Sequence, residues 1–162
     1  MQNLIKNGAL QPDDAWVLIV DEATTAPTDA PAIWPLQQYL VQRQSGQLSG
    51  QPHGVWLNEE QMVDELAEVL DELALVALHF PKFADGRSFS KARLLRERLS
   101  FTGEIRAVGD FLPDQVDYLA RCGVDAFACR NEQEANTALS MLDTFSVHYQ
   151  SDTHQTPLFQ QR

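Results

Sequence analysis

This 162-residue sequence has few long apolar runs and only two cysteines. Its first half also has few lysines and arginines. No window approaches the roughly 20 apolar residues that span a bilayer, and the N-terminal stretch turns acidic too early for a secretory signal. We therefore expect no membrane association and a cytoplasmic location. Two cysteines, Cys122 and Cys129, cannot build a disulfide framework, and alone they cannot hold an iron–sulfur cluster.

Common motifs for cofactors and catalysis are also missing. The chain has no GxGxxG after a strand, no GxxxxGK[ST] loop, no CxxC pair, and no His, Cys or Asp set at metal-ligand spacing. We therefore expect no metal and no cofactor, and the sequence leaves catalytic residues unknown.

Charge is distributed unevenly. The formal net charge is -11, which argues against binding to nucleic acid or to anionic membranes. Residues 1–81 hold two basic and twelve acidic residues, whereas residues 82–130 hold nine of the twelve lysines and arginines. Two interpretations stay open for the middle segment. Its cations form surface ion pairs on helices, or they converge into a site for an anion or an acidic partner.

Strands and helices alternate along the chain. Short apolar runs predict strands at 15–20, 32–34, 54–57, 73–80, 105–108, 125–129 and 145–149. The run at 73–80 is continuously apolar, as in a parallel strand buried on both faces. Helices are expected between these strands, and residues 58–73 show the clearest amphipathic pattern. Asn58 and Gln61 form a capping-box pattern at its start, and Asn131 with Glu134 forms a second one.

The spacing of these elements predicts an α/β fold. Repeated βα units should form an open, mostly parallel sheet or half-barrel of about four to six strands, with helices on the outside. A complete eight-unit barrel needs about 250 residues, more than this chain has. We expect one domain over residues 1–149, followed by a flexible C-terminal tail at 150–162.

Ligands in such folds bind beyond the carboxyl ends of the strands. The segments that follow the strands ending near 80, 108 and 129 should share this edge. The candidate anion- or partner-binding residues there are Lys82, Asp85, Gly86, Arg87, Ser88, Ser90, Arg93, Asp110 and Arg130.

Two interpretations of these candidates remain. In the first, Lys82, Arg87 and Arg130 point into one pocket and, with backbone N–H groups at a helix start, bind a small oxyanion. In the second, Asp85–Gly86 is only a turn, Arg87 pairs with Asp110, and Ser88 or Ser90 only caps the helix. Arg93 is placed to pair with Glu97 one helical turn away. Two roles stay open for Arg96 and Arg98, which lie on other sides of the same helix: a solvated surface role, which we expect, or a face that docks a partner.

Three blocks resemble the bacterial domain of unknown function 934 family. They are 75–98 (LVALHFPKFADGRSFSKARLLRER), 103–110 (GEIRAVGD) and 121–127 (RCGVDAF), and the resemblance extends from Ile5 to Tyr149. The family is often labelled "oxidoreductase probably involved in sulfite reduction". This resemblance implies a role in sulfur assimilation, and it adds Phe83 to the candidates. It brings no established catalytic residues.

Three functions follow as hypotheses. The first is a non-catalytic accessory protein of assimilatory sulfite reduction that docks on a sulfite reductase component. The alternative is an enzyme or sensor that binds sulfite, sulfate or a phosphate-like oxyanion at the Lys82–Ser90 loop. The third is a homo-oligomer formed through an exposed sheet edge.

Overall fold

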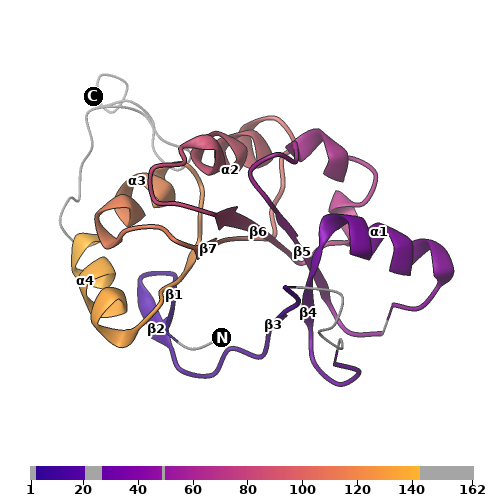
Figure 1. Cartoon of the computed structure of the whole chain (residues 1–162), viewed down its shortest axis with the longest axis horizontal. Coiled ribbons are helices and arrows are strands. Elements are labelled where there is room, and N and C mark those ends of the chain that lie inside the picture. The colour runs from indigo at the N-terminus through magenta and orange to yellow at the C-terminus, as the bar shows by residue number, and fades with distance from the viewer. Residues whose placement is uncertain (1–2, 21–26, 49, 143–162) are drawn as a thin grey trace, which may run out of the picture.

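One sheet of eight strands organises the molecule (Figure 1). In this computed structural model, residues 3–20, 27–48 and 50–142 are described. The strand order is β2-β1-β8-β7-β6-β5-β4-β3. The strands are β1 (Leu4–Lys6), β2 (Ala9–Gln11), β3 (Val17–Leu18), β4 (Ala32–Pro35), β5 (His53–Leu57), β6 (Leu75–Phe80), β7 (Glu104–Gly109) and β8 (Ala126–Ala128).

The sheet is mixed rather than fully parallel. Each strand from β3 to β7 pairs in parallel with the next one along the chain. The hairpin of β1 and β2 then adds to β8 in antiparallel orientation. Asn7 and Gly8 turn this hairpin with φ of 52° and 72°. Positive φ at both central residues is the conformation that tight two-residue hairpins need, and Asn-Gly adopts it most easily.

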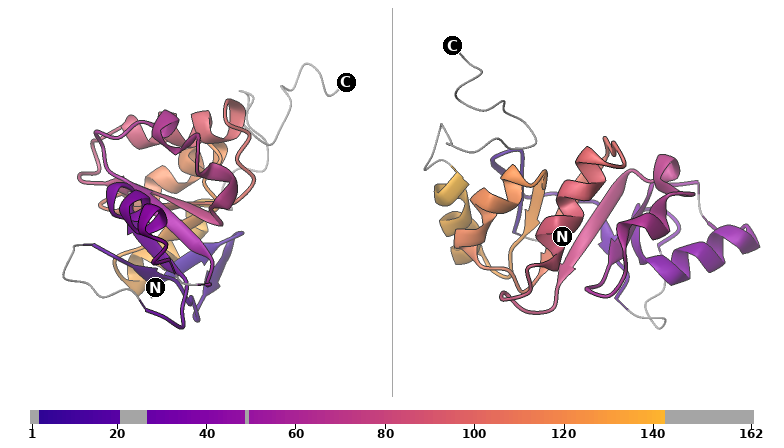
Figure 2. Two further views of the ribbon diagram at one scale, coloured as in Figure 1. Left: turned by 90° about the vertical axis from the view of Figure 1, so that its right-hand side faces the viewer. Right: turned by 90° about the horizontal axis from the view of Figure 1, so that it is seen from above.

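The short link between the two edges shows why the sheet curls. Gln11 ends β2 at one edge, and Val17 begins β3 at the other. Six residue steps reach at most about 21 Å, whereas eight strands laid flat would span about 34 Å. The edges must therefore approach each other, and the sheet forms a half-barrel (Figures 1 and 2).

In the described residues, four α-helices pack against one face of this sheet. They are α1 (Leu36–Ser45), α2 (Arg87–Glu97), α3 (Val116–Arg121) and α4 (Glu132–Leu142). Their buried side chains share one large apolar cluster with Val76, Leu78 and Phe80 of β6. The alternate β6 residues, Leu75 and Ala77, belong to a smaller cluster that contains no helical residue. Strand β6 is buried on both faces, so the prediction of a doubly buried parallel strand in the apolar run at 73–80 is confirmed.

The helix expected over residues 58–73 is wrong. Asn58 and Gln61 do make the reciprocal bonds of a capping box. However, Met62 is extended, and only two short 3₁₀ turns follow, η1 (Val63–Leu66) and η2 (Leu70–Glu72). Acidic side chains recur there at four-residue intervals: Glu60, Asp64, Glu68 and Glu72. Like charges at this spacing destabilise a continuous helix, so the apolar side chains are buried without one.

The other predicted elements have mixed outcomes. Six of the expected strands correspond to β3 to β8. Of the strand expected at 15–20, only Val17–Leu18 is formed. The strand expected at 145–149 and the tail at 150–162 lie outside the described residues. Among the described residues, no helix is long and apolar enough to cross a membrane.

Candidate functional site

The carboxyl edge of the parallel strands brings the predicted loops together. Strands β6, β7 and β8 are neighbours and run in the same direction. The chain therefore leaves all three at one edge, as the sequence predicts. The loop after β6 carries Lys82, Asp85 and Gly86, and α2 carries Arg87, Ser88, Ser90 and Arg93, while Asp110 follows β7 and Arg130 follows β8.

Arg87 folds back on its own loop. Its guanidinium lies 2.5 Å from the carboxylate of Asp85, and its backbone N–H donates to the same carboxylate at 3.1 Å. The predicted pairing of Arg87 with Asp110 is therefore wrong, because Asp85 is two residues away and closer at hand. The side-chain bonds from Arg87, together with its backbone N–H, lower the pKa of Asp85 to about 2.

Arg130 supplies the ion pair that joins two neighbouring loops. Its guanidinium lies 2.6 Å from Asp110 and 2.8 Å from Glu134 on the first turn of α4. The hydrogen bonds from Arg130 lower the pKa of Glu134. Two of the three cations proposed for an oxyanion pocket, Arg87 and Arg130, are thus already bound to carboxylates of this chain.

The helix start does not use a serine cap, contrary to prediction. Helix α2 begins at Arg87 after Gly86, and the carboxylate of Asp85 accepts its first N–H. Ser88 is buried, and its hydroxyl donates to the carbonyl of His79 at 3.1 Å. Ser90 lies exposed on the next turn. Ser88 therefore joins α2 to the end of β6, and the carboxylate of Asp85 caps the start of α2.

Lysines and arginines further along α2 divide into exposed and buried groups. Lys82 is exposed before the helix, and Arg93 pairs with Glu97 at 2.8 Å as predicted. Lys91, which sequence reasoning did not single out, is only 5% exposed and donates to the carbonyl of Asn58 at 2.5 Å. Burial, and next the charge of Arg87, lowers the pKa of this lysine. Lys91 therefore ties the end of β5 to α2.

Two further cations that the sequence prediction missed are Arg106, which is buried, and Arg96, which is largely buried. Arg96 donates to the carbonyls of Phe101, Gly103 and Gly123 and pairs with Asp125, so its expected surface role is wrong. Arg106, in the middle of β7, is fully buried. The sequence does carry a signal for the ion pair of Arg106, namely an arginine inside an apolar strand. An arginine is rarely buried unless an acidic side chain pairs with it.

The ion network around Arg106 lies toward the amino end of β7. Its guanidinium lies 2.8 Å from Asp14 and 2.6 Å from Glu104, and Lys6 of β1 pairs with the same glutamate at 2.6 Å. Although burial opposes it, hydrogen bonding with Arg106 lowers the pKa of Asp14. These contacts hold the segment between β2 and β3 against the sheet.

Aromatic side chains form a connected group beside the carboxyl edge. Phe83 and Tyr118 are 51% and 49% exposed. The ring of Tyr118 lies 5.3 Å from that of Phe89, which in turn lies 5.7 Å from Phe80. Gln115 donates to the carbonyl of Phe83 at 2.9 Å and so holds the loop after β6 near the start of α3. Neither Phe89 nor Tyr118 was singled out from sequence, since helical aromatics usually belong to the core.

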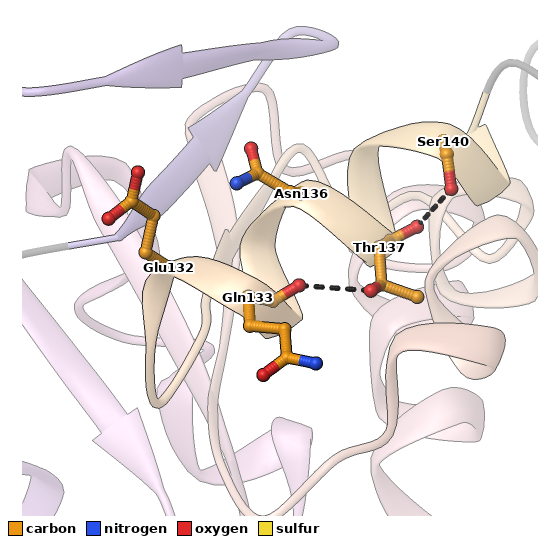
Figure 3. A pocket seen from close by; sticks show the side chains of 5 residues that line it. All are labelled: Glu132, Gln133, Asn136, Thr137 and Ser140. Carbon is orange, nitrogen blue, oxygen red and sulfur yellow. Dashed lines mark hydrogen bonds between the residues drawn. The ribbon is translucent and has the colours of Figure 1, made fainter.

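A shallow hollow runs along the polar side of α4 (Figure 3). The lining residues are Glu132, Gln133, Asn136, Thr137 and Ser140. The two hydroxyls already donate to backbone carbonyls, Thr137 to Gln133 at 2.9 Å and Ser140 to Thr137 at 2.7 Å. Across the described part of the chain, no group of three His, Cys, Asp or Glu side chains could hold a metal.

Sequence comparison places this chain among bacterial proteins. Residues 54–159 match the family described as "Bacterial protein of unknown function (DUF934)". No curated protein matches the chain. Since the match covers well over half of the 162 residues and includes the carboxyl-edge loops, the chain belongs to this bacterial family of unknown function.

Proposed function

We propose that this protein is a non-catalytic accessory protein of assimilatory sulfite reduction that docks on a component of the sulfite reductase in the cytoplasm. The resemblance of its three sequence blocks to proteins labelled for sulfite reduction supplies the pathway. In this arrangement the helices cover the outer face of the half-barrel. The loops at the carboxyl edge and α2 are then presented to a partner.

One observation carries the docking role. The guanidiniums at the carboxyl edge are exposed and are already paired with carboxylates of the same chain, Arg87 with Asp85 and Arg130 with Asp110. A small oxyanion would have to displace these carboxylates before it could bind. A protein partner can instead contact such ion pairs as they stand, together with the exposed aromatic rings next to them.

A binding measurement with purified components tests this proposal. The tagged full chain is expected to retain the purified sulfite reductase on a column. Arg87→Ala and Arg93→Ala should weaken that retention, since both guanidiniums are exposed on α2. Arg43→Ala is the matched control, because Arg43 lies on α1 in a comparable exposed ion pair with Glu72. A reductase that passes through the column without binding contradicts the proposal.

The oxyanion alternative makes a different prediction. Calorimetry with sulfite, sulfate and phosphate should then give heat that disappears when Lys82 and Arg87 are both replaced by alanine. Absence of heat with all three ions would leave docking as the remaining hypothesis for this edge.

A further inference from the structure

Five residues beside the carboxyl edge form one surface, which we name the α2–α3 face. They are Phe83 from the loop after β6, Phe89 and Arg93 from α2, and Tyr118 and Arg121 from α3. Helices α2 and α3 lie side by side (Figures 1 and 2), and the contact between the rings of Phe89 and Tyr118 joins them. Single exposed apolar residues are common, whereas connected ones are typical of interaction sites.

The rings of Tyr118 and Phe89 are held in place by contacts within the chain. Tyr118 packs against Phe89 at an interplanar angle of 32°, and Phe89 packs edge-on against the core residue Phe80 at an angle of 85°. The hydrogen bond from Gln115 fixes the backbone of Phe83. Rings that are already ordered lose little conformational entropy on binding, which favours them as anchors in an interface.

Guanidiniums border these rings. Arg121 lies over Tyr118, with 5.7 Å between the guanidinium carbon and the ring centroid. Arg93 pairs with Glu97 one turn along the helix, and both side chains are about half exposed. An exposed pair of this kind contributes only a few tenths of a kcal/mol. A protein that is already held at this face by its other contacts can therefore place a carboxylate against Arg93, whereas a free oxyanion has no such contacts. Tyrosine and arginine are the side chains most enriched at interface hot spots.

The charge distribution indicates what kind of partner fits. Residues 1–81 carry twelve acidic and two basic residues, whereas residues 82–130, which contain this face, carry nine basic and seven acidic residues. Three of the nine, Lys91, Arg96 and Arg106, are held in contacts within the chain. The cations of the α2–α3 face itself are Arg93 and Arg121. A basic partner would be attracted to most of this acidic molecule without preference. An acidic partner is repelled by most of the chain, and it is directed to the segment that holds the cations.

We propose that the α2–α3 face docks a folded protein whose contact area carries carboxylates around an apolar centre, with Tyr118 and Phe83 as anchors. This inference rests on the proposed docking role. It adds the surface and the chemistry of the partner, and it does not require that partner to be a sulfite reductase.

Site-specific cross-linking in living cells tests the location of the surface. A photoreactive benzoylphenylalanine replaces Phe83 or Tyr118 in the full chain, and the control carries it at Val41, which is 62% exposed on α1. We expect one cross-linked protein from positions 83 and 118 and none from position 41. Mass spectrometry identifies that protein, and its sequence gives its net charge.

The outcomes separate this inference from the proposed function. An acidic sulfite reductase component supports both, and a different acidic protein supports the surface while it contradicts the sulfite role. A basic partner, a second copy of this chain, equal cross-linking from position 41, or no cross-link at all overturns the inference.

Affinity measurements with the identified, purified partner then test the anchors. Tyr118→Ala is expected to weaken binding by about thirtyfold or more, as for interface hot spots. Val41→Ala should leave the affinity unchanged. Arg93→Glu should slow association and reduce its salt dependence, whereas Arg43→Glu on α1 should not. Circular dichroism and unfolding curves verify that each variant is folded, and an unchanged affinity in folded Tyr118→Ala contradicts the proposal.

Discussion

The two ends of the parallel strands use the same residue types in opposite ways. Toward the amino end, Arg106 and Arg96 are buried, with side chains 1% and 15% exposed. At the carboxyl end, Arg87 and Arg130 make equally close ion pairs, but their side chains are 56% and 50% exposed. Burial, and not the presence of a pair, therefore decides which arginines support the fold and which remain accessible to other molecules.

The largest expected difference between the two ends comes from Arg106. Arg106→Ala removes the guanidinium that pairs with the buried carboxylates of Asp14 and Glu104, of which Glu104 keeps its contact with Lys6, and should cost about 3–5 kcal/mol of unfolding free energy. Urea unfolding followed by circular dichroism measures this loss of unfolding free energy. Arg130→Ala removes the same group at the exposed end, and an equal loss there would contradict the comparison.

A smaller loss is expected from Arg96→Ala. This substitution leaves three carbonyls without their donor and removes the partner of Asp125, at about 2–4 kcal/mol. Amide hydrogen exchange should also become faster at Ile105, whose N–H donates to the same carboxylate. Unchanged exchange at Ile105 would indicate that Arg96 does not order this end of the sheet.

At the exposed end, Arg130→Ala should change the unfolding free energy by only about 0–1 kcal/mol. Its ion pairs with Asp110 and Glu134 lie in solvent, where water compensates for their loss. The same urea titration measures this value, and raised salt should reduce it further. A loss above about 2 kcal/mol would contradict this prediction, because losses of that size are expected for buried ion pairs.

The smallest effect concerns the pH dependence of Asp85. Its pKa falls from 3.8 to about 2 in the folded protein, so its stabilising contribution is complete above the unfolded value and is lost as the pH falls toward 2. Asp85→Asn should therefore differ from the native chain at pH 6 and converge with it near pH 2. Urea midpoints across this range test the prediction, and a gap that widens on acidification would contradict it.

Local patterns explain most of what the sequence predicted correctly. Apolar runs identified the parallel strands, and their common direction placed the loops with Arg87, Asp110 and Arg130 at one edge. The hairpin of β1 and β2 was not predicted, although Asn7–Gly8 between short apolar runs is a hairpin signal. The helix over 58–73 failed because the apolar pattern took no account of the repulsion between its acidic side chains.

Long-range pairing explains what the sequence could not predict. Arg106 meets Asp14 across 92 residues, and no spacing rule connects them. Arg87 took the nearest carboxylate, Asp85, in place of Asp110 beyond the next strand. Parallel neighbours predict which loops share an edge, but side-chain partners depend on the curl of the sheet and on which acids it brings within reach.

The pairing of β1 with β8 has a consequence for synthesis of the chain. Strands β4 to β8 can add to β3 one at a time as they leave the ribosome, because each of them pairs with its predecessor. The N-terminal hairpin is made first, yet its partner Ala126–Ala128 is translated more than a hundred residues later. We therefore expect the nascent chain to carry an undocked hairpin while β3 to β8 are translated. The hairpin can join the sheet only after β8 emerges.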